Sequence, residues 1–136
     1  MIYNAIMHYI PKSVNVILEK KAQHTLENVV FSLDMLDKKP NSMCFIGKSL
    51  QAGRAYLTLK KYSPNTKLYQ RSVNPLFPLA LELLTVNNWH YYPEFVGRVW
   101  GEFLRIKKYG ERGDIDYNNV EKDLIDQIEN SVCMKG

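Results

Sequence analysis

The chain has 136 residues, and its 18 lysine and arginine residues against 14 aspartate and glutamate residues give a net charge of +4. This length fits a single domain over residues 1–136 whose core needs neither a disulfide nor a metal. The contents of 46% hydrophobic and 24% charged residues are those of a globular protein and exclude wholesale disorder. The charge is uneven, with a balance of +7 over residues 1–73 and −3 over residues 74–136.

The sequence contains no segment typical of a membrane span or a signal peptide. The longest apolar run, Leu76 to Val86, is interrupted by Pro78 and Glu82, whereas a span needs roughly 20 predominantly apolar residues. The segment 1–10 lacks the basic start of a signal peptide. We therefore expect a cytoplasmic protein without a membrane anchor.

No motif in the sequence predicts catalysis or a metal site. Cys44 and Cys133 are far apart and are expected to be free thiols. The three histidines have no ligand spacing with each other or with the cysteines, so neither a metal nor another cofactor is predicted. Residues 45–49 resemble the end of a phosphate-binding loop, but Ser42 stands where that motif requires glycine. We do not expect an enzyme.

The first third of the chain has the periodicity of a helix. Apolar residues recur at spacings of three and four from Leu18 to Leu36, and Ser13 is the candidate N-cap. Residues 23–25 interrupt this pattern, so Thr25 is a second candidate cap. The Lys-Lys-Pro-Asn sequence at 38–41 ends the predicted helix.

A second long helix is predicted to begin after Ser42, because apolar residues at helical spacing continue to Leu57. This interpretation assigns residues 45–49 to a helix. A turn at residues 64–66 and a short helical or irregular stretch over 67–72 follow it.

Three more helices are predicted in the second half. Asn74 and Pro75 are a cap residue and a first-turn proline, and this helix ends at residues 87–88. The next helix, around residues 94–108, has a wide apolar face that must be buried. The last helix follows Asp116. Because no segment shows convincing strand alternation, we predict an all-α bundle of helices around the hydrophobic helix at 94–108.

The helix at 94–108 contains an unusual pair of glycines. Gly97 and Gly101 are four residues apart and share one face, and each costs roughly 1 kcal/mol relative to alanine in a helix. This loss of helix stability indicates that another helix or a bound peptide approaches the backbone at the two glycines. Arg98 lies between them, and its alternative interpretation is a surface arginine paired with Glu94 or Glu102.

Two segments resemble motifs of the Bcl-2 family of apoptosis regulators. Gly97-Arg98-Val99, followed by apolar and aromatic residues, resembles the first homology region of that family. Ala52-Gly-Arg-Ala-Tyr56 resembles the third homology region. Ala52 and Arg98 are 46 positions apart (98 − 52), which matches the spacing in the family, and the resemblance extends over residues 45–105.

The resemblance implies a Bcl-2-like helical bundle of the short, divergent kind that large DNA viruses encode. Its implied function is to inhibit host-cell apoptosis by holding the third-homology-region (BH-3) helix of pro-apoptotic proteins in a surface groove. Arg98 would bind an aspartate of that helix, and Gly97 and Gly101 would let the helix lie close. The implied floor and walls of the groove are Tyr56, Leu59, Leu68, Val86 and Trp89.

Several of these residues have a purely structural alternative. Tyr56 and Leu59 suit a hydrophobic core equally well, and Trp89 suits a plug at a helix break. Arg54 replaces the acid of the third homology region, which favours an inhibitor over a pro-death ligand.

Two other functions are alternatives. A Bcl-2-shaped viral adaptor would inhibit immune signalling through another surface. A helical nucleic-acid-binding protein would use scattered lysines that form no single stripe, so we expect no nucleic-acid partner. These lysines are Lys20, Lys21, Lys38, Lys39, Lys60, Lys61 and Lys67.

The aromatic residues 89–92 suit either a homodimer contact or the core.

Overall fold

A computed structural model describes residues 2–73 and 93–130 of the chain. The described α-helices are α1 (Ile2–Ile6), α2 (Thr25–Asp34), α3 (Ala52–Tyr62), α4 (Pro93–Glu111) and α5 (Asn119–Glu129). Two strands, β1 (Ser42–Lys48) and β2 (Lys67–Val73), and two short 3-10 helices, η1 (Met7–Tyr9) and η2 (Ser49–Gln51), complete the described elements.

The two strands form a parallel sheet, so the all-α prediction is wrong. Their register pairs Ser42 with Lys67 and Lys48 with Val73. Parallel neighbours need a crossover connection, and α3 supplies it as the middle of a β-α-β unit. The protein is therefore mixed α/β, and residues 2–73 and 93–130 do not form the all-α, Bcl-2-like bundle that the sequence suggested.

Strand β1 was predicted as the start of a helix, and its exposed face explains the error. Exposure alternates along the strand, so Met43 and Phe45 are half-buried while Cys44 and Ile46 are exposed. Because Cys44 and Ile46 are apolar, the sequence lacks the alternation of apolar and polar residues that marks a strand. Ile46 instead completes an apolar spacing of four with Leu50, which imitates a helix.

The long helix predicted from Ser13 is also shorter than expected. Only residues 25–34 are α-helical in this region, and residues 15–23 have no regular secondary structure. The Nδ1 atom of His24 accepts a hydrogen bond from the Glu27 amide at 3.3 Å, which makes His24 the N-cap in place of Ser13 or Thr25. The predicted interruption at 23–25 is thus the true beginning of the helix.

A small apolar core joins α2 to the β-α-β unit. Val29 and Leu33 from α2 and Leu59 from α3 are buried in one cluster. Partly buried hydrophobic residues from both strands and from α3 pack against it, namely Met43, Phe45, Tyr62 and Leu68. Each element contributes too little apolar surface to be stable alone, so the core holds these four elements together.

The two predicted helices at 94–108 and after Asp116 are present as α4 and α5. Helix α5 begins with a capping box, in which Asn118 and Glu121 satisfy each other's backbone amides. The predicted cap Asp116 lies two residues before the observed cap, and its carboxylate binds the Lys60 ammonium at 3.0 Å. The helix predicted to follow Asn74 lies outside the described residues.

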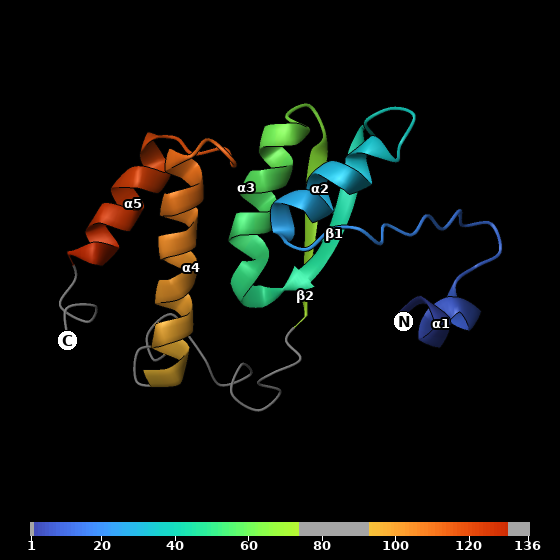
Figure 1. The fold of residues 1–136 in the computed structure, drawn as a ribbon, viewed down its shortest axis with the longest axis horizontal. Helices are drawn as coiled ribbons and strands as arrows, with labels where there is room; N and C mark the ends of the chain where they lie inside the picture. Colours follow the sequence, from blue (N-terminus) through green and yellow to red (C-terminus); the bar gives the residue numbers. More distant parts are fainter. Residues whose placement is uncertain (1, 74–92, 131–136) are drawn as a thin grey trace.

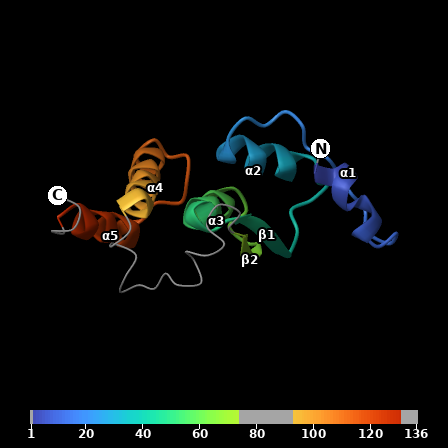
Figure 2. The same cartoon turned by 90° about the horizontal axis from the view of Figure 1, so that it is seen from below.

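The elements lie in a row. Figure 1 shows α4 and α5 at one end, α2, α3 and the two strands in the middle, and α1 at the other end. Figure 2, turned by 90°, shows α2 lying across α3 and β1. This arrangement leaves α2 as the cover of the β-α-β unit, and the space beneath that cover forms the candidate site.

Candidate functional site

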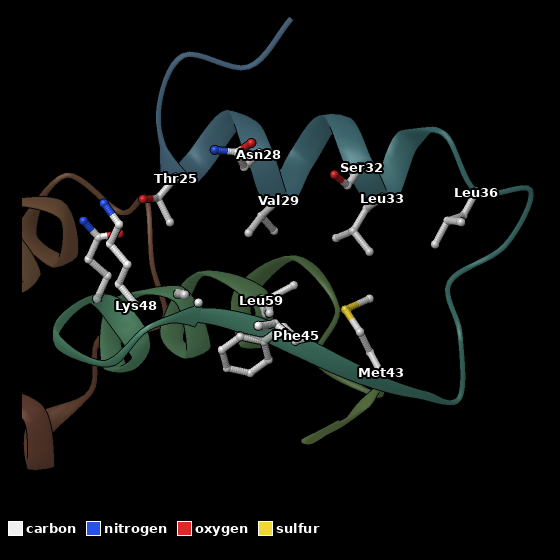
Figure 3. A pocket seen from close by; sticks show the side chains of 14 residues that line it. Thr25, Asn28, Val29, Ser32, Leu33, Leu36, Met43, Phe45, Lys48 and Leu59 are labelled. Atoms are coloured by element: carbon white, nitrogen blue, oxygen red, sulfur yellow. The ribbon is translucent and has the colours of Figure 1, made fainter. Parts of the chain in front are cut away.

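An apolar groove of about 410 Å³ runs between α2 and the β-α-β unit. Figure 3 shows Val29 and Leu33 extending from α2 toward Leu59 and Met43 on the opposite side. Polar and apolar side chains from several elements and the segment after α2 line this groove. They are Thr25, Asn28, Val29, Ser32, Leu33, Leu36, Met43, Phe45, Ile46, Gly47, Lys48, Gln51, Ala55 and Leu59.

The two ends of the groove differ in character. Thr25 and Lys48 lie at one end, and Leu36 and Met43 lie at the other (Figure 3). Within the described residues, Lys48 forms no ion pair. The groove therefore combines an apolar floor with a positive charge at one end, a combination suited to an amphipathic ligand that carries an acid.

The structure brings two of the predicted groove residues together and separates a third. Leu59 lines the groove and is only 5% exposed, because it belongs to the core. Leu68 packs against the same core from β2. Tyr56 is 39% exposed and does not line the groove. The structural alternative therefore holds for Leu59, while Tyr56 lies outside both the core and the groove.

The predicted residues around Arg98 lie on α4, outside the groove. Gly97 is exposed, and a Cβ atom there would have no neighbour within 4 Å in the described part of the chain. At Gly101 a Cβ atom would meet the Arg105 side chain at 3.3 Å. The expected close approach to this pair is therefore not made by another described helix. Val86 and Trp89 lie outside the described residues.

Sequence reasoning missed the role of Arg54. Its Nε atom donates to Glu102 at 2.9 Å, and its Nη1 atom donates to the Thr25 hydroxyl at 2.7 Å. Both Arg54 and Glu102 are buried, so this ion pair connects α3 to α4 in the interior. The only sequence signal was position, since Leu57 and Thr58 follow Arg54 by three and four residues and lie on the same buried face.

Glu102 also differs from its predicted role. The sequence offered it as a partner of Arg98, but its two carboxylate oxygens accept from Arg54 and from Arg105. Arg105 is half exposed and lies three residues along the same helix. The three side chains form one cluster at the contact between α3 and α4.

Among the described residues there is no group of three histidine, cysteine or acidic side chains that could hold a metal ion. None of the described helices is long and apolar enough to cross a membrane. Comparison of the chain with protein-family models, with curated proteins and with solved structures finds no match.

Proposed function

We propose that this protein binds an amphipathic helical peptide in the groove between α2 and β1. The observation that carries the proposal is the apolar groove of about 410 Å³ with Lys48 at one end. A helix that enters a hydrophobic groove inserts side chains at spacings of three and four residues. A volume of this size accommodates a few such anchors.

Apolar anchors in the groove would supply the main part of the binding free energy. A fully buried leucine-sized side chain contributes about 1.5–3 kcal/mol. Three such anchors contribute about 4.5–9 kcal/mol, whereas a micromolar Kd requires about −8 kcal/mol to remain after the cost of lost translational and rotational freedom. Micromolar affinity therefore requires a fourth anchor and a groove that is largely preformed. The buried cluster of Val29, Leu33 and Leu59 supplies such a preformed wall.

The positive end of the groove gives the ligand a direction. An acidic side chain near one end of the peptide would meet the Lys48 ammonium, and an ion pair at this exposed position contributes mainly to orientation. The preferred ligand is therefore an amphipathic helix with four apolar anchors and an acid next to them.

The partner that the sequence suggests has this chemistry. The third-homology-region helix of pro-apoptotic proteins is amphipathic and carries an aspartate, and its sequestration would inhibit apoptosis in a host cell. The support for this partner is the pair of motifs at residues 52–56 and 97–101. Both motifs are helical, in α3 and α4.

The test is a titration of fluorescently labelled peptides, including a panel of third-homology-region peptides, against the wild type and two matched variants. Leu36 lines the groove and is 38% exposed, while Leu104 on α4 is 43% exposed and lies outside it. We expect Leu36→Asp to weaken binding at least 10-fold through loss of apolar contact. Leu104→Asp should bind like the wild type.

Arg98→Ala and Lys48→Ala separate the two candidate partners of the ligand's acid. If the peptide lies in the groove, Lys48→Ala weakens binding modestly and Arg98→Ala leaves it unchanged. If the acid binds Arg98 as the family resemblance implies, Arg98→Ala costs about 1.5–3 kcal/mol, the value of a hydrogen bond to a charged group. Absence of binding by every peptide would overturn the proposal.

A further inference from the structure

A second, smaller cavity lies on the other side of Thr25. Its volume is about 200 Å³, and it is lined by residues from the start of α2, from α3, from the end of α4 and from the following loop. The polar residues of this lining are His24, Thr25, Arg54, Thr58, Tyr109, Arg112 and Asp114. The cavity therefore differs from the peptide groove in that most of its lining residues have a side chain capable of hydrogen bonding.

Arg54 has unused hydrogen-bonding capacity at this cavity. Its side chain is buried, with Nε and Nη2 directed to the Glu102 carboxylate and Nη1 to Thr25. A guanidinium has five N–H groups, so two of them make no hydrogen bond within the described residues. Thr25 accepts from Arg54 and keeps its own O–H available to donate.

The charges around Arg54 do not balance. Glu102 is the single acid in hydrogen-bonding contact with two guanidiniums, those of Arg54 at 2.9 Å and Arg105 at 2.9 Å. The three side chains together carry one net positive charge. The Arg105 side chain is 51% exposed and keeps its charge in water, so an anion in the cavity would be held by the N–H groups of Arg54 rather than by an unbalanced buried charge.

The Tyr109 ring contacts both arginines that line the cavity. The guanidinium carbons of Arg54 and Arg112 lie 5.8 Å and 5.2 Å from the centre of its ring. Arg112 is bound to the Asp114 carboxylate, so this pair adds no net charge. The anion would therefore be held by the buried Arg54 and by Thr25, with the more exposed Arg112 as a weaker contact.

We infer that this cavity binds a small oxyanion, either a phosphate group or a carboxylate, through the Arg54 guanidinium and the Thr25 hydroxyl. Guanidinium N–H groups bind both kinds of oxyanion with short, charge-assisted hydrogen bonds. The volume of about 200 Å³ admits such a group with a small substituent. Anion binding here does not depend on the proposed peptide binding.

Isothermal titration calorimetry at constant ionic strength, with inorganic phosphate and with acetate against a chloride background, tests the inference on the full chain. We expect saturable binding of at least one of the two anions. Binding of phosphate alone identifies a phosphate group, and binding of acetate identifies a carboxylate. Absence of binding by both anions would overturn the inference.

Three variants locate the anion. Thr25→Val keeps the shape of the side chain and removes the hydroxyl, so we expect affinity to fall about 10- to 100-fold. Arg112→Gln, at an exposed position, should weaken binding by a smaller factor and keeps the test usable if Thr25→Val is unstable. Lys108→Gln removes a positive charge from the exposed surface of α4 and should bind normally. An equal loss in Lys108→Gln would show non-specific screening and reject the site.

Discussion

The two halves of the described protein are held together by different forces. Helix α2 and the β-α-β unit share an apolar core made by residues such as Val29, Leu33 and Leu59. Helix α4 and the segment after it are joined to that unit by the ion pairs Arg54–Glu102 and Lys60–Asp116 and by a hydrogen bond from the Asp116 amide to the Leu57 carbonyl. Salt has little effect on apolar packing and on the buried Arg54–Glu102 pair, whereas it screens the more exposed Lys60–Asp116 pair. We therefore expect the attachment of the second region to be the one that responds to solution conditions.

The uneven charge of the sequence has a structural counterpart in this division. In both of these ion pairs the base comes from residues 1–73 and the acid from residues 74–136. Part of the charge difference between the two halves, +7 and −3, is therefore neutralised by ion pairs within the molecule. A basic first half is not by itself a reason to expect a nucleic-acid partner.

The largest expected effect is that of breaking the buried ion pair. Arg54→Met leaves the Glu102 carboxylate buried with only the half-exposed Arg105 beside it. Removal of one member of such a pair costs about 3–5 kcal/mol. We expect that loss in the free energy of unfolding measured in urea, and hydrogen exchange should show α4 losing more protection than α2.

The double variant Arg54→Met/Glu102→Met is the decisive control. It removes both charges and should recover most of the stability. If it is as unstable as Arg54→Met, the interior contact depends on shape and the ionic description of the second region is wrong. Arg105→Met, at a side chain that is 51% exposed, should cost less than about 1 kcal/mol.

A cavity created by mutation in the apolar core should lower the free energy of unfolding somewhat less. Leu59 is 5% exposed, and truncation of a buried leucine to alanine costs about 2–5 kcal/mol. We expect Leu59→Ala to lower the free energy of unfolding by that amount, equally at low and high salt. The matched substitution Leu104→Ala, at a half-exposed position, should stay within about 0.5 kcal/mol of the wild type. A strong salt dependence for Leu59→Ala would contradict the division into an apolar and an ionic region.

The smallest effect is expected from the exposed ion pair, and it has a pH signature. The hydrogen bond from Lys60 to Asp116, helped by their attraction, raises the pKa of the Lys60 ammonium above its usual 10.5. A raised pKa in the folded state means that the pair stabilises the fold below pH about 10.5 and loses this contribution as pH rises through the raised pKa.

Thermal unfolding of the wild type and of Lys60→Gln measures this contribution. The difference in Tm should be constant from about pH 7 to 10 and should shrink above that range. Glu129 also raises the pKa of Lys107, but Lys107 is present in both proteins and cancels in the difference. A Tm difference that persists at the highest pH would mean that Lys60 acts through its hydrocarbon chain.

The sequence predicted α4 and α5 because their signals are local. Pro93 is a first-turn proline, the wide apolar face of α4 is visible over many residues, and residues 118–121 form a capping box in the structure. The strand at 42–48 was missed because its exposed face carries Cys44 and Ile46, which hide the alternation. The role of Arg54 could not be predicted, because its partner lies 48 positions away and nothing local identifies it.

The candidate site was hard to predict for the same reason, because its residues come from segments far apart in the sequence. Leu59 and Leu68 were named as groove residues from a resemblance, and both contact the core. The observed groove between α2 and β1 differs from the groove that the resemblance implied. It was not predicted, because α2 forms one of its walls and this segment was expected to pack in a helical bundle. A site formed by elements without a shared local pattern requires the fold to be known first.

The buried ion pair also sets the order in which the molecule assembles. The paired strands are 25 positions apart (67 − 42), and Arg54 and Glu102 are 48 apart. Doubling a loop costs only about 0.6 kcal/mol of chain entropy, so the loop length alone does not decide the order. Desolvation of Glu102 costs several kcal/mol unless Arg54 is already in place. We therefore expect α3 to be formed and packed on the strands before α4 docks. Docking of α4 would then be the last step of folding, and its release from α3 would be the first step of unfolding.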